Sequence, residues 1–233
     1  MRRVVLLLTV LAAAWTLSPG AFAASQASRS GAAAAQPATP DGLAKALQLR
    51  YERIRDFSAS FTQTYRGGTL RTQAREQGTV SVKKPGMMRW TYTQPEKKEI
   101  VSDGRKLYLY YPADKQVIVS DVPADSEAST GAMFLAGRGD LGRDFTAAAA
   151  ESVVAGGVAI KLTPRRPQPD YEHLVIAIDP ASLQIRALTT FDRLGGENTL
   201  TFTNLKENTG VSEKEFMFRI PGGVTVATND SPR

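Results

Sequence analysis

The stretch Gly78-Thr-Val-Ser-Val-Lys-Lys-Pro-Gly-Met-Met-Arg-Trp-Thr-Tyr-Thr-Gln-Pro95 predicts a strand, a turn and a second strand. Pro85-Gly86 breaks the chain between two runs of alternating residues. Because successive side chains of a strand point to opposite faces, the second run places large apolar groups on one face: Met88, Trp90 and Tyr92. Three basic residues stand close by: Lys83, Lys84 and Arg89. Two interpretations follow, an ordinary hairpin with one core face or the mouth of an apolar pocket.

The N-terminal residues 1–23 have the three parts of a secretory signal peptide. Met1-Arg2-Arg3 is basic, Val4 to Leu17 is apolar, and Ala21-Phe22-Ala23 is a small-x-small cleavage site. The apolar run is shorter than the ~20 residues that span a bilayer, so a retained anchor is not expected. Residues 24–38 are of low complexity and predict a disordered leader. We expect a single domain over residues 39–233, with a loose tail from about residue 228.

Composition excludes several classes of function. The chain has 233 residues, no cysteine and one histidine, and its net charge of +6 falls to about +4 when Arg2 and Arg3 are removed. Disulfides, thiol chemistry, cysteine metal sites and a cysteine-linked lipid anchor are therefore excluded. Basic residues are scattered among acidic ones, so no nucleic-acid partner is expected.

Hydrophobic periodicity predicts one helix followed by many strands. Thr39-Pro40-Asp41 is typical of a helix start. An apolar stripe follows at helical spacing: Leu43, Leu47, Tyr51 and Ile54. From Phe57 the apolar period becomes two, and about ten or eleven antiparallel strands are expected. The later strands are expected at 152–155, 159–163, 173–178, 185–192, 198–206 and 215–219, after a short helical segment between 125 and 142. This pattern indicates a mainly β protein, with one large curved sheet or partial barrel covered by helices.

The sequence offers little for catalysis. His173 is the one histidine, and no serine stands in a G-x-S-x-G elbow. The glycine pattern at 137–142 lacks the strand and helix that a dinucleotide site needs. A paired-carboxylate site stays open, although the acidic residues considered for it fall at expected turns: Asp103, Asp114 and Asp192. We expect no enzyme activity, no cofactor and no metal site.

Large or flexible apolar residues are the candidates for ligand binding, since methionine suits a site that accepts variable shapes. The alternative is that the same residues only form the core. The candidates come from the helix, the first strand, the hairpin and the internal segment: Leu43, Leu47, Ile54, Phe57, Phe61, Met87, Met88, Trp90, Tyr92, Met133, Phe134 and Leu135.

Several short signatures occur in the order in which they occur in the periplasmic outer-membrane lipoprotein carrier (LolA) family, which the chain resembles from about Leu43 to Val226. They are Phe57-Ser-Ala-Ser-Phe-Thr-Gln63, the strand from Gly78 to Val82-Lys-Lys-Pro85 with Arg89-Trp90, Thr93-Gln-Pro95, Val101-Ser-Asp-Gly104, Leu107-Tyr-Leu-Tyr-Tyr-Pro112, Leu162-Thr-Pro164 and Phe216-Met-Phe-Arg-Ile-Pro-Gly-Gly-Val224. The resemblance implies an unclosed antiparallel β-barrel with a short helical lid over a hydrophobic cavity.

The resemblance also implies a function. Such a protein is a soluble periplasmic carrier, expected here to be a monomer. It takes acylated lipoproteins released by an inner-membrane ABC transporter and passes them to an outer-membrane acceptor lipoprotein, where one is present. The family often has an arginine before the strand-turn proline, where it holds the lid. Lys84 stands at that place and cannot make the forked contact of arginine. Lys84, with the help of Arg89, is the candidate lid latch.

Two other functions stay open. A periplasmic lipid or lipoprotein sensor would have the same fold, and a secreted hydrolase would use the paired carboxylates. Lipid that co-purifies with the protein would favour a carrier or a sensor, whereas an empty protein with hydrolytic activity would favour the hydrolase.

Overall fold

The computed structural model describes residues 39–67, 73–122, 135, 137 and 139–228. The predicted signal peptide, the predicted leader and two candidate residues, Met133 and Phe134, lie outside this range. In the described residues no helix combines the length and the hydropathy that crossing a membrane requires.

Helix α1 (Pro40–Glu52) begins where the sequence predicts a helix. The Thr39 hydroxyl accepts a hydrogen bond from the Gly42 N–H at 3.2 Å, and Pro40 occupies the first turn, where a missing N–H costs nothing. Asp41 lies in the same turn, where a negative charge suits the helix dipole. One side of α1 is buried: Leu43, Ala44, Leu47 and Tyr51.

Twelve strands of the described residues form one sheet, in the order β12-β6-β5-β4-β3-β2-β1-β11-β10-β9-β8-β7. Their bounds are β1 (Asp56–Arg66), β2 (Gln73–Lys83), β3 (Met87–Gln94), β4 (Lys98–Asp103), β5 (Lys106–Tyr111), β6 (Gln116–Asp121), β7 (Phe145–Ala150), β8 (Val158–Pro164), β9 (His173–Ile178), β10 (Ile185–Phe191), β11 (Glu197–Glu207) and β12 (Thr225–Thr228). Because β7 and β12 are its two edges, the sheet is not closed, and the prediction of a mainly β, unclosed architecture is confirmed.

Three local expectations differ from the structure. The strand expected at 152–155 lies earlier, as β7, where an alanine run pairs with β8 despite its weak strand propensity. The strand expected at 215–219 is replaced by the 3₁₀ turn η1 (Glu213–Phe216), which the Ser212 hydroxyl caps. The sheet has twelve strands rather than ten or eleven, and β12 pairs with β6 in parallel.

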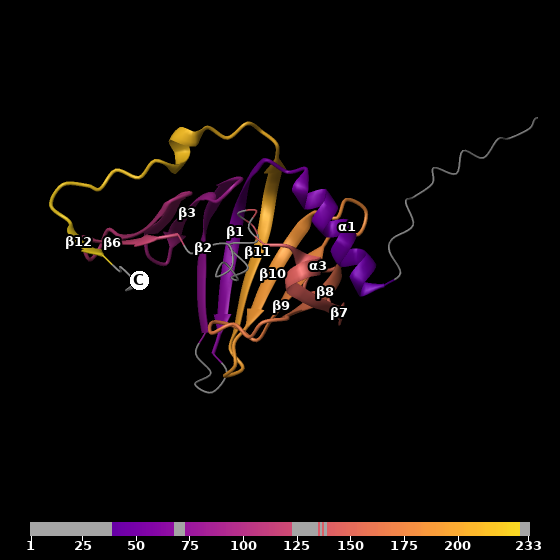
Figure 1. Cartoon of the computed structure of the whole chain (residues 1–233). Coiled ribbons are helices and arrows are strands. Elements are labelled where there is room, and N and C mark those ends of the chain that lie inside the picture. Colours follow the sequence, from indigo (N-terminus) through magenta and orange to yellow (C-terminus); the bar gives the residue numbers. More distant parts are fainter. Residues whose placement is uncertain (1–38, 68–72, 123–134, 136, 138, 229–233) are drawn as a thin grey trace, which may run out of the picture. The chain divides into compact units, whose positions relative to one another are not determined.

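The two faces of the sheet differ, because cross-strand partners share a face. We call the face that carries Phe57, Val80 and Trp90 the inner face and the opposite one the outer face. Helix α1 and the short helix α3 (Leu141–Asp144) lie on the same side of the sheet, over the half that contains β7 and β8 (Figure 1). The main hydrophobic core joins the buried side of α1 to the inner face.

An aromatic cluster fills the inner face where β1, β2 and β3 meet. The Phe61 ring lies edge-on to two rings of β3, with centroid distances of 5.0 Å to Trp90 and 4.9 Å to Tyr92. Gly78 lies on β2, between β1 and β3. It is the cross-strand partner of Phe61 on β1 and of Tyr92 on β3. The hairpin of the opening sequence is therefore part of the core.

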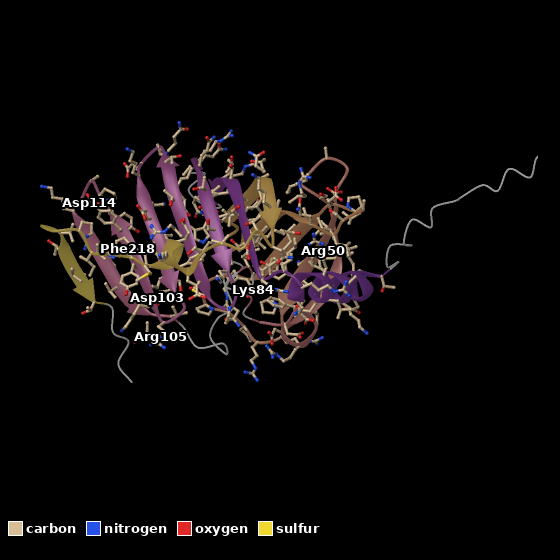
Figure 2. All side chains as sticks on the ribbon, turned by 90° about the horizontal axis from the view of Figure 1, so that it is seen from above. Arg50, Lys84, Asp103, Arg105, Asp114 and Phe218 are labelled. Atoms are coloured by element: carbon tan, nitrogen blue, oxygen red, sulfur yellow. The ribbon has the colours of Figure 1, made fainter. Side chains whose placement is uncertain are left out.

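The outer face of β3 to β6 is covered by the chain that follows β11. Phe216 of η1 is buried there, and the Phe218 ring packs on Tyr108 and Tyr110 at 5.2 and 5.8 Å. Figure 2 shows Phe218 over this part of the sheet, well away from α1. The C-terminal segment thus closes a second apolar layer on the face opposite to α1.

Candidate functional site

The inner face gathers most of the residues that the sequence singles out for binding. One buried core contains side chains from α1, β1 and β3, together with Ile54 after the helix and Leu135. Its members among the candidates are Leu43, Leu47, Ile54, Phe57, Phe61, Met88, Trp90, Tyr92 and Leu135. These residues pack on one another, so in this conformation they form a core beneath α1.

Met87 and Arg89 lie on the outer face, because they alternate with Met88 and Trp90 along β3. The Arg89 guanidinium pairs with Glu99 and donates to the carbonyl oxygens of Glu215, at 2.6 Å, and Met217, at 3.2 Å. Arg89 therefore anchors the C-terminal segment on the face opposite to the helix. Its position does not support the role in a lid latch.

Lys84 lies at the C-terminal end of α1, as Figure 2 shows. Its ammonium group is 3.5 Å from the centre of the Tyr51 ring and donates a hydrogen bond to the Tyr51 carbonyl oxygen. That carbonyl belongs to the last turn of the helix, where carbonyl groups lack helical partners and a positive charge suits the dipole. Lys84 therefore joins the turn between β2 and β3 to the end of α1.

Leu135 and Gly137 lie at the same point. The Tyr51 hydroxyl donates to the Leu135 carbonyl oxygen at 2.6 Å. A Cβ atom at Gly137 would lie 2.6 Å from Lys84 Cδ and 2.7 Å from Lys84 Cγ, so the lysine stem needs a glycine there. Three segments distant in sequence thus meet at the pair Lys84 and Tyr51.

Burial changes the acid–base properties of this pair. It lowers the pKa of Lys84 from 10.5 to about 8, against the opposing effects of Glu52 and Glu207. Burial also raises the pKa of the Tyr51 hydroxyl well above its usual value, with a further contribution from Glu207. Near neutral pH the lysine is charged and the tyrosine is neutral, as their contacts require.

The pKa of Lys84 predicts a pH dependence of stability. Since the folded-state pKa of about 8 lies below the unfolded value of 10.5, the unfolded chain binds the extra proton between these values, and stability rises with pH across that range. Other groups also titrate in this pH range. The contribution of Lys84 to stability is therefore measured as the difference from the variant Lys84→Arg, whose side chain stays charged. We expect the urea midpoint of the natural chain, relative to that variant, to increase from pH 7 to pH 9.5. A constant difference would mean that the amine is not desolvated.

A second polar contact holds the last turn of α1, and the sequence gives no signal for it. The Arg50 guanidinium forms two hydrogen bonds with the Glu207 carboxylate on β11, at 3.1 and 2.7 Å, and its Nε donates to the Ser182 carbonyl oxygen. The partners are more than a hundred residues away in sequence, so only the tertiary structure could identify them.

A small void lies beneath this last turn of α1. Its volume is about 10 Å³, about the space of one water molecule. Its lining is mostly apolar: Arg50, Tyr51, Phe57, Leu135, Ile185, Phe202, Leu205 and Glu207. An acyl chain is far larger, so it could enter here only if α1 or Leu135 moved.

The sequence also did not indicate a row of half-buried apolar residues that extends the inner face beyond α1. Ile100 is the cross-strand partner of Trp90, Leu109 is the partner of Ile100, and Ile118 is the partner of Leu109. All three are only partly buried, and Leu107 lies on the same face. The row runs from the core across β4, β5 and β6.

Two of the three acidic residues considered for a paired-carboxylate site stabilise the turns in which they stand. Asp103 accepts from the backbone N–H groups of Arg105 and Lys106, and Asp192 accepts from those of Leu194 and Gly196, each at 2.8 Å. In the described part of the chain, no group of three or more His, Asp or Glu side chains is arranged to hold a metal ion.

Comparisons with known proteins agree with this architecture. Residues 52–219 match the family model described as outer membrane lipoprotein carrier protein LolA. An outer-membrane lipoprotein carrier protein of Hahella chejuensis is 29% identical over 182 residues, which cover 78% of this chain and 86% of the relative. The protein of that name from Chromohalobacter salexigens is 30% identical over 202 residues, which cover 84% and 93%.

A solved structure shares the fold at lower sequence similarity. The crystal structure of an uncharacterised conserved protein from Thermus thermophilus superposes with a TM-score of 0.52 at 15% identity, covering 80% of this chain and 99% of that chain.

Proposed function

Because its residues 52–219 match the LolA family model, the chain belongs to the outer-membrane lipoprotein carrier family, and we propose that it binds the acyl chains of lipoproteins in the periplasm and delivers them to the outer membrane. The acyl chains would lie on the inner face of the sheet after α1 and Leu135 move aside. The carrier role rests on the family. The place of binding rests on the structure of the inner face.

One observation carries this placement. The inner face is an apolar surface that starts in the core beneath α1 and ends in the half-buried row Ile100, Leu109 and Ile118. Its cover over the core is a helix whose last turn is held by polar contacts from Lys84 and Arg50. Polar contacts of this kind can be exchanged for water at small net cost, so the cover can be both closed and reopened.

The cost of opening the cover offsets part of the free energy of acyl-chain binding. Burying a methylene contributes about 0.8 kcal/mol, so ~14 methylenes of one chain contribute roughly 11 kcal/mol. Three chains would approach about 33 kcal/mol, beyond the ~18–21 kcal/mol ceiling of known affinities. Lifting Leu43 and Leu47 from the sheet costs about 1.5–3 kcal/mol each and offsets part of this. Partial burial and a costly opening together would allow release.

The wider transport route is part of the proposal. Residues 1–23 would direct export and be removed, and residues 24–38 would form a leader before the carrier domain. The cargo would come from an inner-membrane lipoprotein-releasing ABC transporter and pass to an outer-membrane acceptor lipoprotein, if one is present. Lys84 would act as the lid latch at the end of α1.

The test is direct binding of an acylated probe. The purified mature protein, freed of lipid, is mixed with a synthetic triacylated lipopeptide or with the same peptide without acyl chains, and examined by native mass spectrometry. We expect a complex with the lipopeptide and none with the bare peptide. Equal binding of both, or of neither, would refute the proposal. Hydrolysis of the lipopeptide would favour the hydrolase alternative.

A further inference from the structure

We propose that the acyl chain enters between the last turn of α1 and strands β10 and β11, and that the Arg50–Glu207 ion pair holds this entrance shut. The inference rests on the function proposed above. It adds the route of the ligand and a positioning role for two residues that contact each other only while α1 is closed.

The Arg50–Glu207 ion pair lies on the solvent side of the void beneath α1. Arg50 and Glu207 both line the void, and their side chains are 22% and 18% exposed, so the pair lies between solvent and the apolar interior. Figure 2 shows Arg50 and Lys84 at separate points near α1. Arg50 contacts β11 and Ser182, whereas Lys84 contacts Tyr51, so the helix end is held at two separate places, with Glu207 also acting electrostatically on Lys84.

Packing is incomplete where this pair sits. Apolar groups that face a void have lost the dispersion contacts which neighbouring atoms would provide. Separating α1 from the sheet therefore breaks fewer contacts at this void than at the well-packed Leu47, which is fully buried. The groups behind the ion pair suit the end of a hydrocarbon chain: Phe57, Ile185, Phe202 and Leu205. A chain that passed the pair would reach the inner face directly.

The Arg50–Glu207 ion pair can hold the entrance shut and still separate when α1 moves. A partly exposed ion pair contributes modestly, because both charges regain water when they separate. Two charge-assisted hydrogen bonds to one carboxylate nevertheless fix the geometry of closure. Removing one charge should therefore leave the fold intact while shifting α1 toward the open arrangement.

The chain offers a matched control for this pair. Arg89 and Glu99 form a similarly exposed ion pair, at 23% and 30%, on the outer face and away from α1. Glu99→Gln removes an interaction of the same type without touching the proposed entrance, and it leaves the Arg89 hydrogen bonds to the Glu215 and Met217 carbonyl oxygens in place. Far-ultraviolet circular dichroism and urea midpoints verify that each variant is folded.

The experiment measures uptake of a 16-carbon fluorescent fatty acid by stopped flow in the natural chain, Glu207→Gln, Glu99→Gln and the exchanged pair Arg50→Glu with Glu207→Arg. Glu207→Gln should take up the probe at least about tenfold faster, the change produced by about 1.4 kcal/mol. Glu99→Gln should stay within about twofold, and the exchanged pair should recover part of the slow rate. Hydrogen exchange of the amides at 50–54 should increase most in Glu207→Gln and should not change in Glu99→Gln.

Two results would overturn the inference in distinguishable ways. If the natural chain takes up the probe and Glu207→Gln shows the same rate and the same exchange, the entrance lies elsewhere while the proposed function stands. If neither the natural chain nor any variant takes up the probe, the proposed function fails, and the entrance fails with it.

Discussion

Replacing Ile118 by aspartate is expected to weaken acyl binding by about 100-fold or more in a chain that still folds. Ile118 is half-buried on the inner face, so in the empty protein the carboxylate keeps contact with water. A bound acyl chain would cover it. An uncompensated buried charge is so unfavourable that the group would take up a proton instead, which costs about 4 kcal/mol at pH 7 for a carboxyl with a usual pKa of about 4.

The next residue of β6 provides the control. Val119 is half-buried too, but it lies on the outer face opposite Tyr108. Val119→Asp introduces the same charge without touching the proposed site, so its affinity for the lipopeptide should stay within about threefold of the natural value. Affinities are measured by fluorescence titration at pH 7 and pH 5, since protonation at the lower pH should partly restore binding to Ile118→Asp. Equal losses in both variants would mean that the inner face is not the binding site.

Replacing Gly78 by alanine is expected to destabilise the protein by about 3 kcal/mol or more, at the upper end of the usual cost of overpacking. A Cβ atom at this position would lie 2.1 Å from the Thr91 carbonyl oxygen and 3.0 Å from the Phe61 ring. The oxygen belongs to the backbone of the neighbouring strand, so it cannot turn away. Alanine would also restrict the unfolded chain, but that gain is below about 1 kcal/mol and the clash outweighs it.

Thermal unfolding followed by circular dichroism measures this effect, and a fall in Tm of roughly 10 °C is expected for a domain of this size. Gly222→Ala is the control, since a Cβ atom there would meet no heavy atom within 4 Å and its backbone is not in the left-handed region. Its Tm should change by less than about 2 °C. If Gly78→Ala were as stable as the control, β2 and β3 could not approach as closely as the structure shows.

Short-range patterns made much of the fold predictable. The alternation in β1 and β3 depends only on the period of a strand, and it correctly places Phe57, Phe61 and Trp90 on one buried face. The start of α1 is equally local, because capping by Thr39 involves the neighbouring turn alone. The strand β7 was missed, since its alanines have no strand preference of their own and are held by pairing with β8.

The candidate site was predictable only in part. The sequence points to Lys84 through a family resemblance, and to the apolar residues of α1 and β3 through their periodicity. It also suggested Arg89 as a latch, although the alternation along β3 already places Arg89 opposite to Met88 and Trp90. Ile100, Leu109 and Ile118 are neighbours only because of the register of strands β3 to β6, which the sequence does not specify.

The class of fold, the buried face of the opening hairpin and the absence of thiol chemistry could all be read from the chain alone, because each depends on composition or on residues a few positions apart. The way in which α1 is held emerges only once the chain is folded, since Arg50 meets Glu207 and Tyr51 meets Leu135 across long stretches of sequence. The packing of the inner face beneath α1, with a void of about 10 Å³, also emerges only in the folded chain. Whether apolar residues form a core or leave a cavity depends on how elements pack together, and residue type alone does not specify that packing.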